Sequence, residues 1–363
     1  MPSHSRIVIC AAGGGKTTRI VSQAIEEPNS RAVLVTYTRN NEYEIEHKLY
    51  AHGPVIPSNI EVTTWFGFLL HEMARPYGRA LHPHRIEGLM WVEGRSVQFV
   101  PASQIGAHYF TKDQLIYSDK LAKFICECDR ATDGAVMRRL AMRFDHIFVD
   151  EIQDMAGYDL DLLERMLKAG IRLTLVGDHR QATFKTNHGK QNSAFSGVKI
   201  IGKFRQWSKA GLAQLTYEQH THRCHQHIAD LGDSFYPAEP KTTSLNSKNT
   251  GHDGIFLVPS AHVDQYVEAY SPQVLRLDRK TQCNGLPALN FGESKGMTFD
   301  RALIFPHGLA KKWLSSGSLT HIEKGLAKMY VGVTRARYSI AFVFDGQSKI
   351  SDAQAYVPGK VQS

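Results

Sequence analysis

The sequence predicts an α/β protein with two parallel-sheet domains, and three observations lead to this prediction. Short apolar runs recur along the chain with turn residues behind them and helical patterns between them, as in a parallel sheet with crossover helices. These runs fall into two successive series. The chain has 363 residues, of which 42% are hydrophobic, so it can bury two cores of ordinary size.

The first series predicts a sheet in the N-terminal part of the chain. A stretch without strong strand runs, residues 78–140, contains helix-like sequence such as 113–129 and is expected to be an insertion in this sheet. We place the first domain at 1–211. The strands are expected at 6–10, 32–37, 60–65, 146–151 and 173–178.

The second series predicts another sheet in a domain at 212–363. Residues 236–253 are polar and rich in turn formers, so they are expected to form a loop or linker. The strands are expected at 213–218, 254–259, 273–278, 301–306 and 339–344.

Charge and cysteine content bound the class of protein. The formal net charge of +8 suits an anionic partner such as a nucleic acid. Five cysteines without a CxxC pair argue against a disulfide framework or a zinc ribbon, and favour a reducing, cytoplasmic location, nucleoid-associated in a bacterium. MPSHSR leads directly into an apolar strand, and no apolar run reaches the ~20 residues of a membrane span, so neither a leader nor a membrane partner is expected.

A glycine-rich loop follows the first strand, in CAAGGGKTT at 10–18. A strand, a glycine loop and a helix in this order point backbone N–H groups at a phosphate, with Lys16 reaching the outer phosphates and the Thr17 hydroxyl holding Mg²⁺. Cys10 stands at the position of the first glycine in the usual pattern. A nucleotide cradle and a simple glycine-rich turn are therefore both open at this point.

Acidic and polar residues end two later strands. Asp150 and Glu151 follow a buried run in FDHIFVDEIQD, and parallel strands place them at the same sheet edge as the glycine loop. Asp150 would hold the metal, and Glu151 would deprotonate the water that attacks a γ-phosphate. Asp178 and Gln181 in LTLVGDHRQA could reach the same phosphate. The alternatives are a solvated acidic pair and a polar loop.

Two arginines in the second half could stabilise charge on a transferred phosphoryl group. Arg223 lies in QHTHRCHQH at 219–227, and Arg335 lies in YVGVTRARYSIAF at 330–342. Cationic groups of this kind are often supplied by a second domain. Taken singly, either arginine could instead be an ordinary surface residue of a basic protein.

In order, eight blocks resemble the motifs of superfamily 1 DNA helicases, most closely the UvrD/Rep group in a compact form with reduced accessory subdomains. CAAGGGKTT resembles motif I, which in this group often tolerates a residue other than glycine at its first position and thus favours the cradle. VDEIQDM and VGDHRQATF resemble motifs II and III. The other blocks are VTYTRNNEYEIEHKL (35–49), VTTWFGFLLHEMA (62–74), LTYEQHTHR (215–223), FGESKGMTFDRALIF (291–305) and YVGVTRAR (330–337).

This resemblance implies two RecA-like P-loop NTPase domains that hydrolyse ATP with Mg²⁺ in the cleft between them and move along single-stranded DNA. The implied catalytic residues are Lys16, Glu151, Gln181, Arg223 and Arg335, and the implied metal ligands are Thr17 and Asp150. ATP would be bound by Ala12, Gly13, Gly14, Gly15, Lys16, Thr17, Thr18 and His222, the last in place of the usual tyrosine. DNA would be bound by Thr36, Tyr37, Arg39, Thr64, Trp65, Phe184, Ser294 and Lys295.

Other interpretations remain open at this point. The chain could be a DNA-binding nucleotide switch, or an accessory ATPase of a partner nuclease that does not unwind, and RNA could replace DNA. Departures from motif III at Thr186 and Asn187 favour the switch. HTHRCHQH could hold a metal, although a helix would spread its side chains around several faces. Tyr109 and Phe110 of the insertion could contact DNA or pack in the core.

Overall fold

The computed structural model describes residues 5–187 and 189–359, so residues 1–4, at the start of the stretch where no leader is expected, lie outside it. The chain forms two compact units. The first consists of Met1–Ile9 and Lys16–Thr216, and the second of Cys10–Gly15 and Tyr217–Ser363. The division into functional domains at 1–211 and 212–363 stays a prediction.

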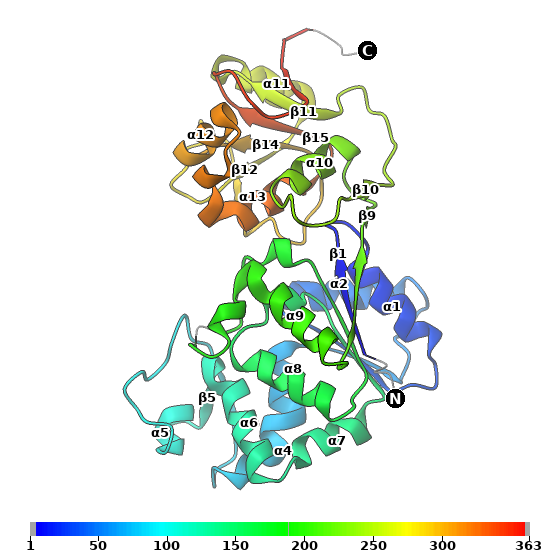
Figure 1. The fold of residues 1–363 in the computed structure, drawn as a ribbon, viewed down its shortest axis with the longest axis vertical. Coiled ribbons are helices and arrows are strands. Elements are labelled where there is room, and N and C mark those ends of the chain that lie inside the picture. The colour runs from blue at the N-terminus through cyan, green and yellow to red at the C-terminus, as the bar shows by residue number, and fades with distance from the viewer. Residues whose placement is uncertain (1–4, 188, 360–363) are drawn as a thin grey trace. The chain divides into compact units, whose positions relative to one another are not determined.

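The main sheet of the first unit is parallel, as predicted (Figure 1). Its strands are β1 (Arg6–Cys10), β2 (Ala32–Thr36), β3 (Ile60–Thr64), β6 (His146–Val149), β7 (Leu173–Gly177) and β8 (Gln214–Glu218). They lie in the order β3-β2-β6-β7-β1-β8, with Val33 opposite Ile147 and Ile7 opposite Leu175. Strands β2, β6 and β7 are buried along their whole length, which explains their continuous apolar sequence.

The strand at 213–218 was expected in the second sheet, and this expectation is wrong. As β8, it extends the first sheet beside β1. The Gln214 amide donates to the Ser5 carbonyl at 2.9 Å, and the Ala11 amide donates to the Glu218 carbonyl at 3.0 Å. A short strand pattern fixes the element type but not the neighbour with which it pairs.

The first unit also contains α-helices around this sheet and its insertion. They are α1 (Lys16–Glu26), α2 (Arg39–Tyr50), α3 (Trp65–Phe68), α4 (Arg75–Tyr77), α6 (Leu121–Ala131), α7 (Ala135–Arg143), α8 (Tyr158–Lys168) and α9 (Ile200–Lys209). Side-chain caps start two of them, because the hydroxyls of Thr38 and Thr64 each accept a hydrogen bond from an amide three residues on, at 3.2 Å. A π-helical turn at Leu69–Ala74 joins α3 to α4.

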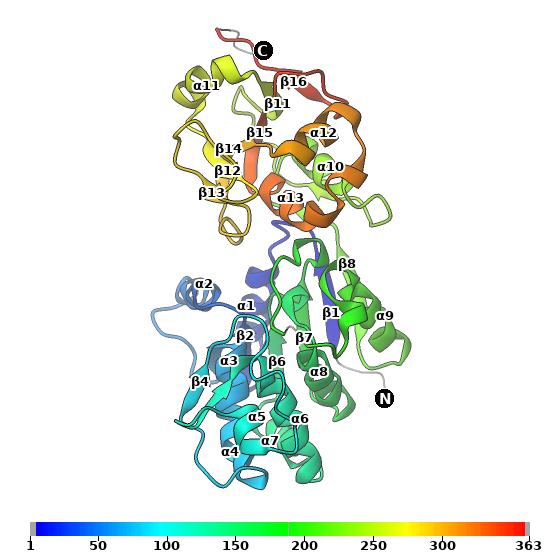
Figure 2. The same cartoon turned by 90° about the vertical axis from the view of Figure 1, so that its left-hand side faces the viewer.

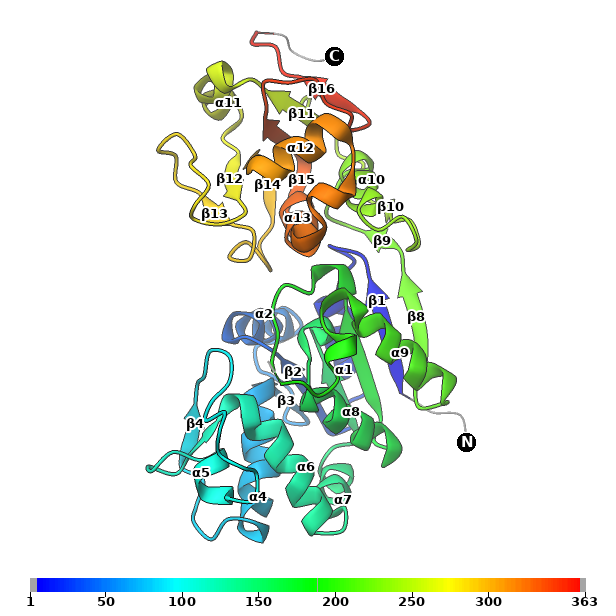
Figure 3. The same ribbon diagram turned by 60° about the vertical axis from the view of Figure 1, so that its left-hand side comes forward.

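The insertion predicted at 78–140 contains a small sheet of its own and lies beside β3, cyan in Figures 2 and 3. It includes α5 (Ile105–Tyr109) and the parallel pair β4 (Gly88–Met90) and β5 (Leu115–Tyr117). The prediction of a helix at 113–129 is therefore correct only for the second part of this stretch, where α6 begins at Leu121. Its first part alternates buried and half-buried residues as a strand.

The second unit repeats the parallel α/β architecture. Its larger sheet contains β11 (Gly254–Val258), β12 (Gln273–Arg276), β13 (Leu289–Asn290), β14 (Phe299–Phe305), β15 (Ala336–Val343) and β16 (Ala353–Ala355). The order is β13-β12-β14-β15-β11-β16, and a small separate sheet pairs β9 (His220–Thr221) with β10 (Thr243–Ser244). The four remaining strands of the second series are thereby confirmed.

Two apolar clusters pack on the faces of the second sheet. One cluster joins the sheet to α10 (Gln226–Ser234), α12 (Gly308–Ser316) and α13 (Leu326–Val333). The other cluster joins the sheet to α11 (Val263–Tyr270). Figure 2 shows α11 and the pair α12 and α13 on opposite sides of the strands. The fold class predicted from the sequence, two parallel α/β units of RecA type, is confirmed.

Candidate nucleotide and nucleic-acid sites

Three neighbouring strands of the first sheet deliver the predicted catalytic residues of the first unit to one edge. Strand β1 leads to the glycine loop and Lys16, β6 leads to Asp150 and Glu151, and β7 leads to Asp178. Because all three strands run parallel, their carboxyl ends share this edge. Lys16, Asp150 and Asp178 are each buried, so their charges act on one another through little water.

A direct hydrogen bond joins the two predicted metal ligands. The Thr17 hydroxyl donates a hydrogen bond to Asp150 Oδ2 at 2.8 Å. Thr17 lies in the first turn of α1, whereas Asp150 directly follows β6, so two segments 133 residues apart converge here. A hydroxyl oxygen beside a carboxylate oxygen is a donor pair that suits Mg²⁺.

The pKa values of the acids that follow β6 and β7 are shifted in opposite directions. Burial, together with the charge of Glu151, raises the pKa of Asp150, and the charge of Lys16 only partly offsets this. Burial would also raise the pKa of Asp178, but the charges of Arg180, Lys16 and His179 and the hydrogen bond from Gln181 together outweigh burial and lower this pKa to about 2. Asp178 is therefore a fixed negative charge at the site.

A polar network links the ends of β6 and β7. The Asp178 amide donates to Gln153 Oε1 at 3.0 Å, and Gln153 Nε2 donates to the Glu151 carboxylate. Gln181 Nε2 in turn donates to Asp178 Oδ2 at 3.0 Å. Glu151 has a left-handed backbone with a φ of 55°, which is uncommon for a residue other than glycine and is often found at functional sites.

The glycine loop, Cys10–Gly15, groups with the second unit. Within that unit the Thr221 hydroxyl donates to the Ala12 carbonyl at 2.6 Å, and the His222 amide donates to the Gly13 carbonyl at 3.0 Å. A Cβ on Gly13 would come within 2.5 Å of Arg223 Cβ, so only glycine fits there.

The end of the loop is less crowded. A Cβ on Gly15 would meet no atom within 4 Å. The main chain is therefore open at Gly15, as a phosphate cradle requires.

Both predicted arginines of the second unit make hydrogen bonds to main-chain carbonyls of that unit. Arg223 Nη1 donates to the Thr334 carbonyl at 3.1 Å. Arg335 is buried, and its guanidinium donates to the carbonyls of Val331 at 3.1 Å and Met297 at 3.2 Å. These bonds fix the Arg335 side chain within its own unit. Of the other predicted nucleotide contacts, Thr18 and His222 are exposed and Gly14 is half-buried.

Several of the predicted DNA contacts of the first unit surround the ends of β2 and β3. The rings of Tyr37 and Phe184 lie with centroids 6.5 Å apart, and Phe184 is 41% exposed. The Arg39 side chain is 79% exposed and makes one long ion pair, 3.8 Å, with Glu42. Tyr37 is half-buried, and the nucleic-acid contacts of these three residues stay predictions.

Trp65 is a different case, and the prediction that it offers a stacking surface is wrong. The indole is fully buried, and its Nε1 donates to Asp159 Oδ1 at 2.8 Å. Thr36 is also fully buried, so neither of these side chains presents a surface to a strand. The Thr64 hydroxyl caps α3. The motif pattern gives the segment correctly but not the direction in which each side chain points.

Two DNA contacts are predicted in the second unit, at Ser294 and Lys295, and the prediction for Ser294 is wrong. Ser294 is fully buried and its hydroxyl donates to the Phe291 carbonyl at 2.9 Å, so this hydroxyl stabilises the turn after β13. Lys295 is half-buried, with its amide donating to the Gly292 carbonyl at 3.2 Å. Its phosphate contact stays a prediction.

The signals that the sequence left open have structural explanations. Tyr109 and Phe110 are buried, and both rings pack against Phe124, with centroids 5.2 and 5.1 Å away. Over residues 5–187 and 189–359, no three His, Cys, Asp or Glu side chains gather as a metal cluster. In the same ranges, no helix combines the length and the apolar character that a membrane span needs.

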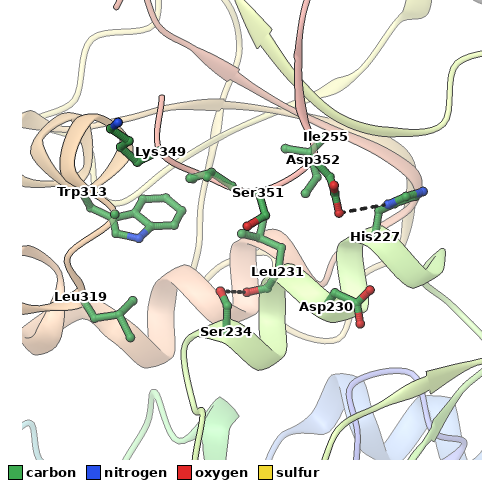
Figure 4. Close-up of a pocket in the computed structure, with 12 residues that line it drawn as sticks. His227, Asp230, Leu231, Ser234, Ile255, Trp313, Leu319, Lys349, Ser351 and Asp352 are labelled. Carbon is green, nitrogen blue, oxygen red and sulfur yellow. Dashed lines mark hydrogen bonds and ion pairs between the residues drawn. The ribbon is translucent and has the colours of Figure 1, made fainter. Parts of the chain in front are cut away.

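A pocket in the second unit lies apart from the predicted site residues, none of which lines it (Figure 4). It has a volume of about 340 Å³. Trp313 and Leu231 contribute apolar surface, and His227 Nδ1 lies 3.7 Å from Asp352 Oδ2 at the other end. The pocket therefore has an apolar part and a charged part.

Sequence reasoning missed two exposed aromatic residues of the insertion. Trp91 is 67% exposed and Phe99 is 98% exposed. Neither belongs to a motif block. The available signal was a set of large apolar residues in a polar, turn-rich stretch, which does not by itself distinguish an exposed ring from a core residue.

Two parallel α/β units, one of which gathers a lysine, a threonine and several acids at one sheet edge, define the RecA-like class. Residues 94–193 match the family model of the UvrD/REP helicase N-terminal domain. This match confirms the resemblance to the UvrD/Rep group over a segment that contains β6, β7, Asp150 and Asp178. No curated protein matches the chain.

Among solved structures, the arterivirus nonstructural protein 10 helicase is similar, with 16% identity, a TM-score of 0.49, and coverage of 94% of this chain and 59% of that one. The same helicase in complex with DNA gives 16% identity, a TM-score of 0.49, and coverage of 94% and 61%. The PRRSV helicase gives 15% identity, a TM-score of 0.47, and coverage of 94% and 52%. The chain thus spans 52% to 61% of the length of these structures.

Proposed function

We propose that this protein is an ATP-dependent translocase or helicase that acts on single-stranded DNA. The observation that carries the proposal is the hydrogen bond from Thr17 to Asp150, at the edge where Lys16 and Asp178 also lie. A threonine after a loop lysine and an aspartate after a neighbouring strand are the protein groups that hold Mg²⁺ on a triphosphate.

The chemistry is hydrolysis of the terminal phosphoanhydride. Lys16 and the N-terminus of α1 would bind the outer phosphates, and Thr17 and Asp150 would hold Mg²⁺, which neutralises charge on the phosphate oxygens. Glu151 would take a proton from the attacking water as its oxygen bonds to the γ-phosphorus and the bond to the β-phosphate oxygen breaks. The hydrogen bond from Gln153 to Glu151 supports this by orienting the carboxylate.

Further residues would respond to the nucleotide. Gln181 is tied to Asp178 and would sense the γ-phosphate or the attacking water. Arg223 and Arg335 would contribute positive charge to the transition state, as the motif resemblance implies. The tie from His222 to Gly13 connects the loop main chain to the segment that contains Arg223. These roles are part of the proposal.

The single DNA strand would be bound by Tyr37, Phe184, Arg39 and Lys295. Exposed rings stack on bases of any sequence, and cationic side chains contact phosphates, so binding is expected to be sequence-tolerant and sensitive to salt. Of these residues, Phe184 lies within the range 94–193 that matches a helicase domain, and the match supports its part of the proposal.

A second candidate is a nucleotide switch that binds DNA and a partner such as a nuclease but does not unwind. One observation favours it. Thr186 and Asn187 point into the protein, with Thr186 Oγ1 accepting from the Ala156 amide at 2.9 Å and Asn187 Nδ2 donating to the Asp119 carbonyl at 2.8 Å. These two side chains are thus occupied in holding the protein together, at the position where motif III usually contacts DNA.

Strand displacement separates the two candidates. The assay uses duplexes with a 3′ tail, a 5′ tail or no tail, with ATP and Mg²⁺ present. A motor displaces the strand from one tailed duplex and leaves the blunt duplex intact. A switch binds the tails but leaves every duplex intact. An RNA tail in place of DNA tests the third possibility, because contacts to phosphates and base faces do not read the 2′-hydroxyl.

A further inference from the structure

Trp91 is the exposed tryptophan of this protein. All four tryptophans lie in the described part of the chain, and the other three, Trp65, Trp207 and Trp313, are 0%, 1% and 3% exposed. Trp91 directly follows β4 and is 67% exposed. Single exposed apolar side chains are common on protein surfaces, so the exposure of Trp91 becomes informative only together with the rings that it contacts.

The Trp91 ring is the end of a continuous row of aromatic rings. It packs edge to face against Phe66, with centroids 4.8 Å apart and an interplanar angle of 73°. Phe66 lies 6.1 Å from Tyr37, and Tyr37 lies 6.5 Å from Phe184. We call these four residues the aromatic row. Trp91 and Phe184, at its two ends, are exposed, whereas Phe66 is buried beneath.

The segment that carries Trp91 is fixed to the rest of the first unit. The Val92 amide donates to Ser118 Oγ at 3.0 Å. Ser96 donates to the Asp119 carboxylate through its amide at 3.0 Å and its hydroxyl at 2.7 Å. The Asp119 carbonyl accepts the hydrogen bond from Asn187, three residues after Phe184. The two exposed ends of the row are therefore held by one connected set of bonds.

We propose that Trp91 stacks on an unpaired base and extends the DNA path from the motif-bearing residues onto the insertion. This inference rests on the proposed function. Tyr37 and Phe184 lie in blocks that resemble DNA-contacting motifs, and the aromatic row joins Trp91 to both without a break. The edge-to-face contact with Phe66 orients the indole while leaving surface exposed, and the positive net charge suits the same anionic ligand.

The test combines fluorescence with affinity. Because the other tryptophans are buried, binding of an oligo-dT strand is expected to quench chiefly Trp91, and Trp91→Phe is expected to abolish the quenching. Anisotropy of a labelled strand should show Trp91→Ala binding about 5-fold to 150-fold more weakly, as expected for one lost stacking contact. Trp91→Phe should recover most of the affinity. Phe99→Ala removes a still more exposed ring outside the row and is the control, with unchanged affinity expected.

A strand with one abasic position distinguishes stacking from a structural role. As the abasic position is moved along the strand, the wild type should lose affinity at the position that meets Trp91, and Trp91→Ala should show no further loss there. If Trp91→Ala binds like the wild type, or loses equal affinity for intact and abasic strands, the inference is overturned. If the wild type does not bind single strands at all, the proposed function fails instead. Unchanged thermal unfolding of each variant confirms that it is folded.

Discussion

The two larger sheets share their architecture but differ at the edge where their strands end. In the first unit, β6 and β7 lead into the buried acids Asp150 and Asp178. In the second unit, β11 and β14 instead lead into prolines, Pro259 and Pro306. An acid that follows β15, Asp345, is exposed and accepts two hydrogen bonds from Ser260, both at 2.7 Å.

This difference separates what the fold needs from what the site needs. The second sheet demonstrates that the architecture forms without charged residues directly after β11 and β14. The first sheet instead buries Lys16, Asp150 and Asp178 together, although taking charges out of water costs several kcal/mol per ion unless they are paired. Arg180 and Lys16 provide part of that pairing. We attribute the remaining polarity of this edge to nucleotide chemistry rather than to stability.

The largest expected effect comes from neutralising Glu151 at the edge of the first sheet, with the same change at Asp345 of the second unit as the control. Glu151→Gln removes the proposed base while keeping the shape of the side chain, so ATP turnover should fall by about 10²-fold to 10⁴-fold with ATP affinity retained. Asp345→Asn makes the same chemical change after a strand of the second sheet and should leave turnover unaltered. Steady-state phosphate release and equilibrium nucleotide binding measure the two quantities.

Equal losses in the two variants would remove the distinction between the edges. Normal hydrolysis by Glu151→Gln would exclude Glu151 as the base and would move the search to other polar groups in the network.

A second prediction concerns a feature that the two units have in common. His146 and His252 are buried and stack on Phe148 and Phe256, with centroids 3.8 and 3.9 Å apart. Burial, and then the charge of a nearby arginine, lowers the pKa of each to about 4. Protons therefore bind more tightly to the unfolded chain, and stability should be lost as the pH falls from about 6.5 to about 4, by up to about 3 kcal/mol per histidine.

His252→Phe should remove this acid sensitivity from the second unit alone. Urea unfolding at about pH 7.5 and about pH 5 should differ less in the variant than in the wild type, by about 2 kcal/mol. The same difference in both proteins would mean that the pKa of His252 does not differ between the folded and the unfolded chain.

A third effect, of similar size, tests the placement of Trp65 in the core. Trp65→Phe keeps an aromatic ring but removes the indole donor to Asp159, a buried carboxyl whose pKa is raised to about 6, chiefly by burial. We expect a loss of about 1 to 3 kcal/mol in unfolding free energy and unchanged affinity for single strands. If Trp65→Phe is as stable as the wild type but binds single-stranded DNA more weakly, Trp65 contacts DNA after all.

The smallest predicted effect compares the two ends of one strand. Arg31 precedes β2 and pairs with Asp145 through its guanidinium at 2.8 and 2.9 Å, whereas Arg39 follows β2 and is mostly exposed. If Arg39 contacts a phosphate, Arg39→Ala should reduce the slope of log affinity against log salt concentration by about 0.7. Arg31→Ala should leave the slope unaltered. Titrations of a labelled single strand at several salt concentrations provide both slopes, and equal slopes for Arg39→Ala and the wild type would exclude the phosphate contact.

The sequence predicted elements better than it predicted partners and side-chain directions. Apolar runs and turn residues are local signals, so the predicted strands are present, and the convergence of β1, β6 and β7 follows from parallel topology alone. The pairing of β8 with β1 depends on contacts more than 200 residues apart, as in the bond from Thr216 to Ile7. Nothing local encodes that choice.

Side-chain orientation explains the remaining differences. Trp65 and Phe66 are neighbours, yet Trp65 reaches Asp159 on α8 and Phe66 reaches Trp91 in the insertion. Ser294 turns inward to the Phe291 carbonyl although it belongs to a motif block. These directions are set by tertiary packing, which a linear pattern does not contain, and for the same reason Trp91 was missed.

The central claim is that the polar edge of the first sheet hydrolyses a nucleoside triphosphate under the control of a single strand. The most direct test is the rate of ATP hydrolysis by the purified protein with Mg²⁺, with and without saturating oligo-dT. We predict slow hydrolysis alone, clear stimulation by the strand, and loss of both rates when Mg²⁺ is chelated. Hydrolysis that does not respond to the strand, or no hydrolysis under either condition, would contradict the account.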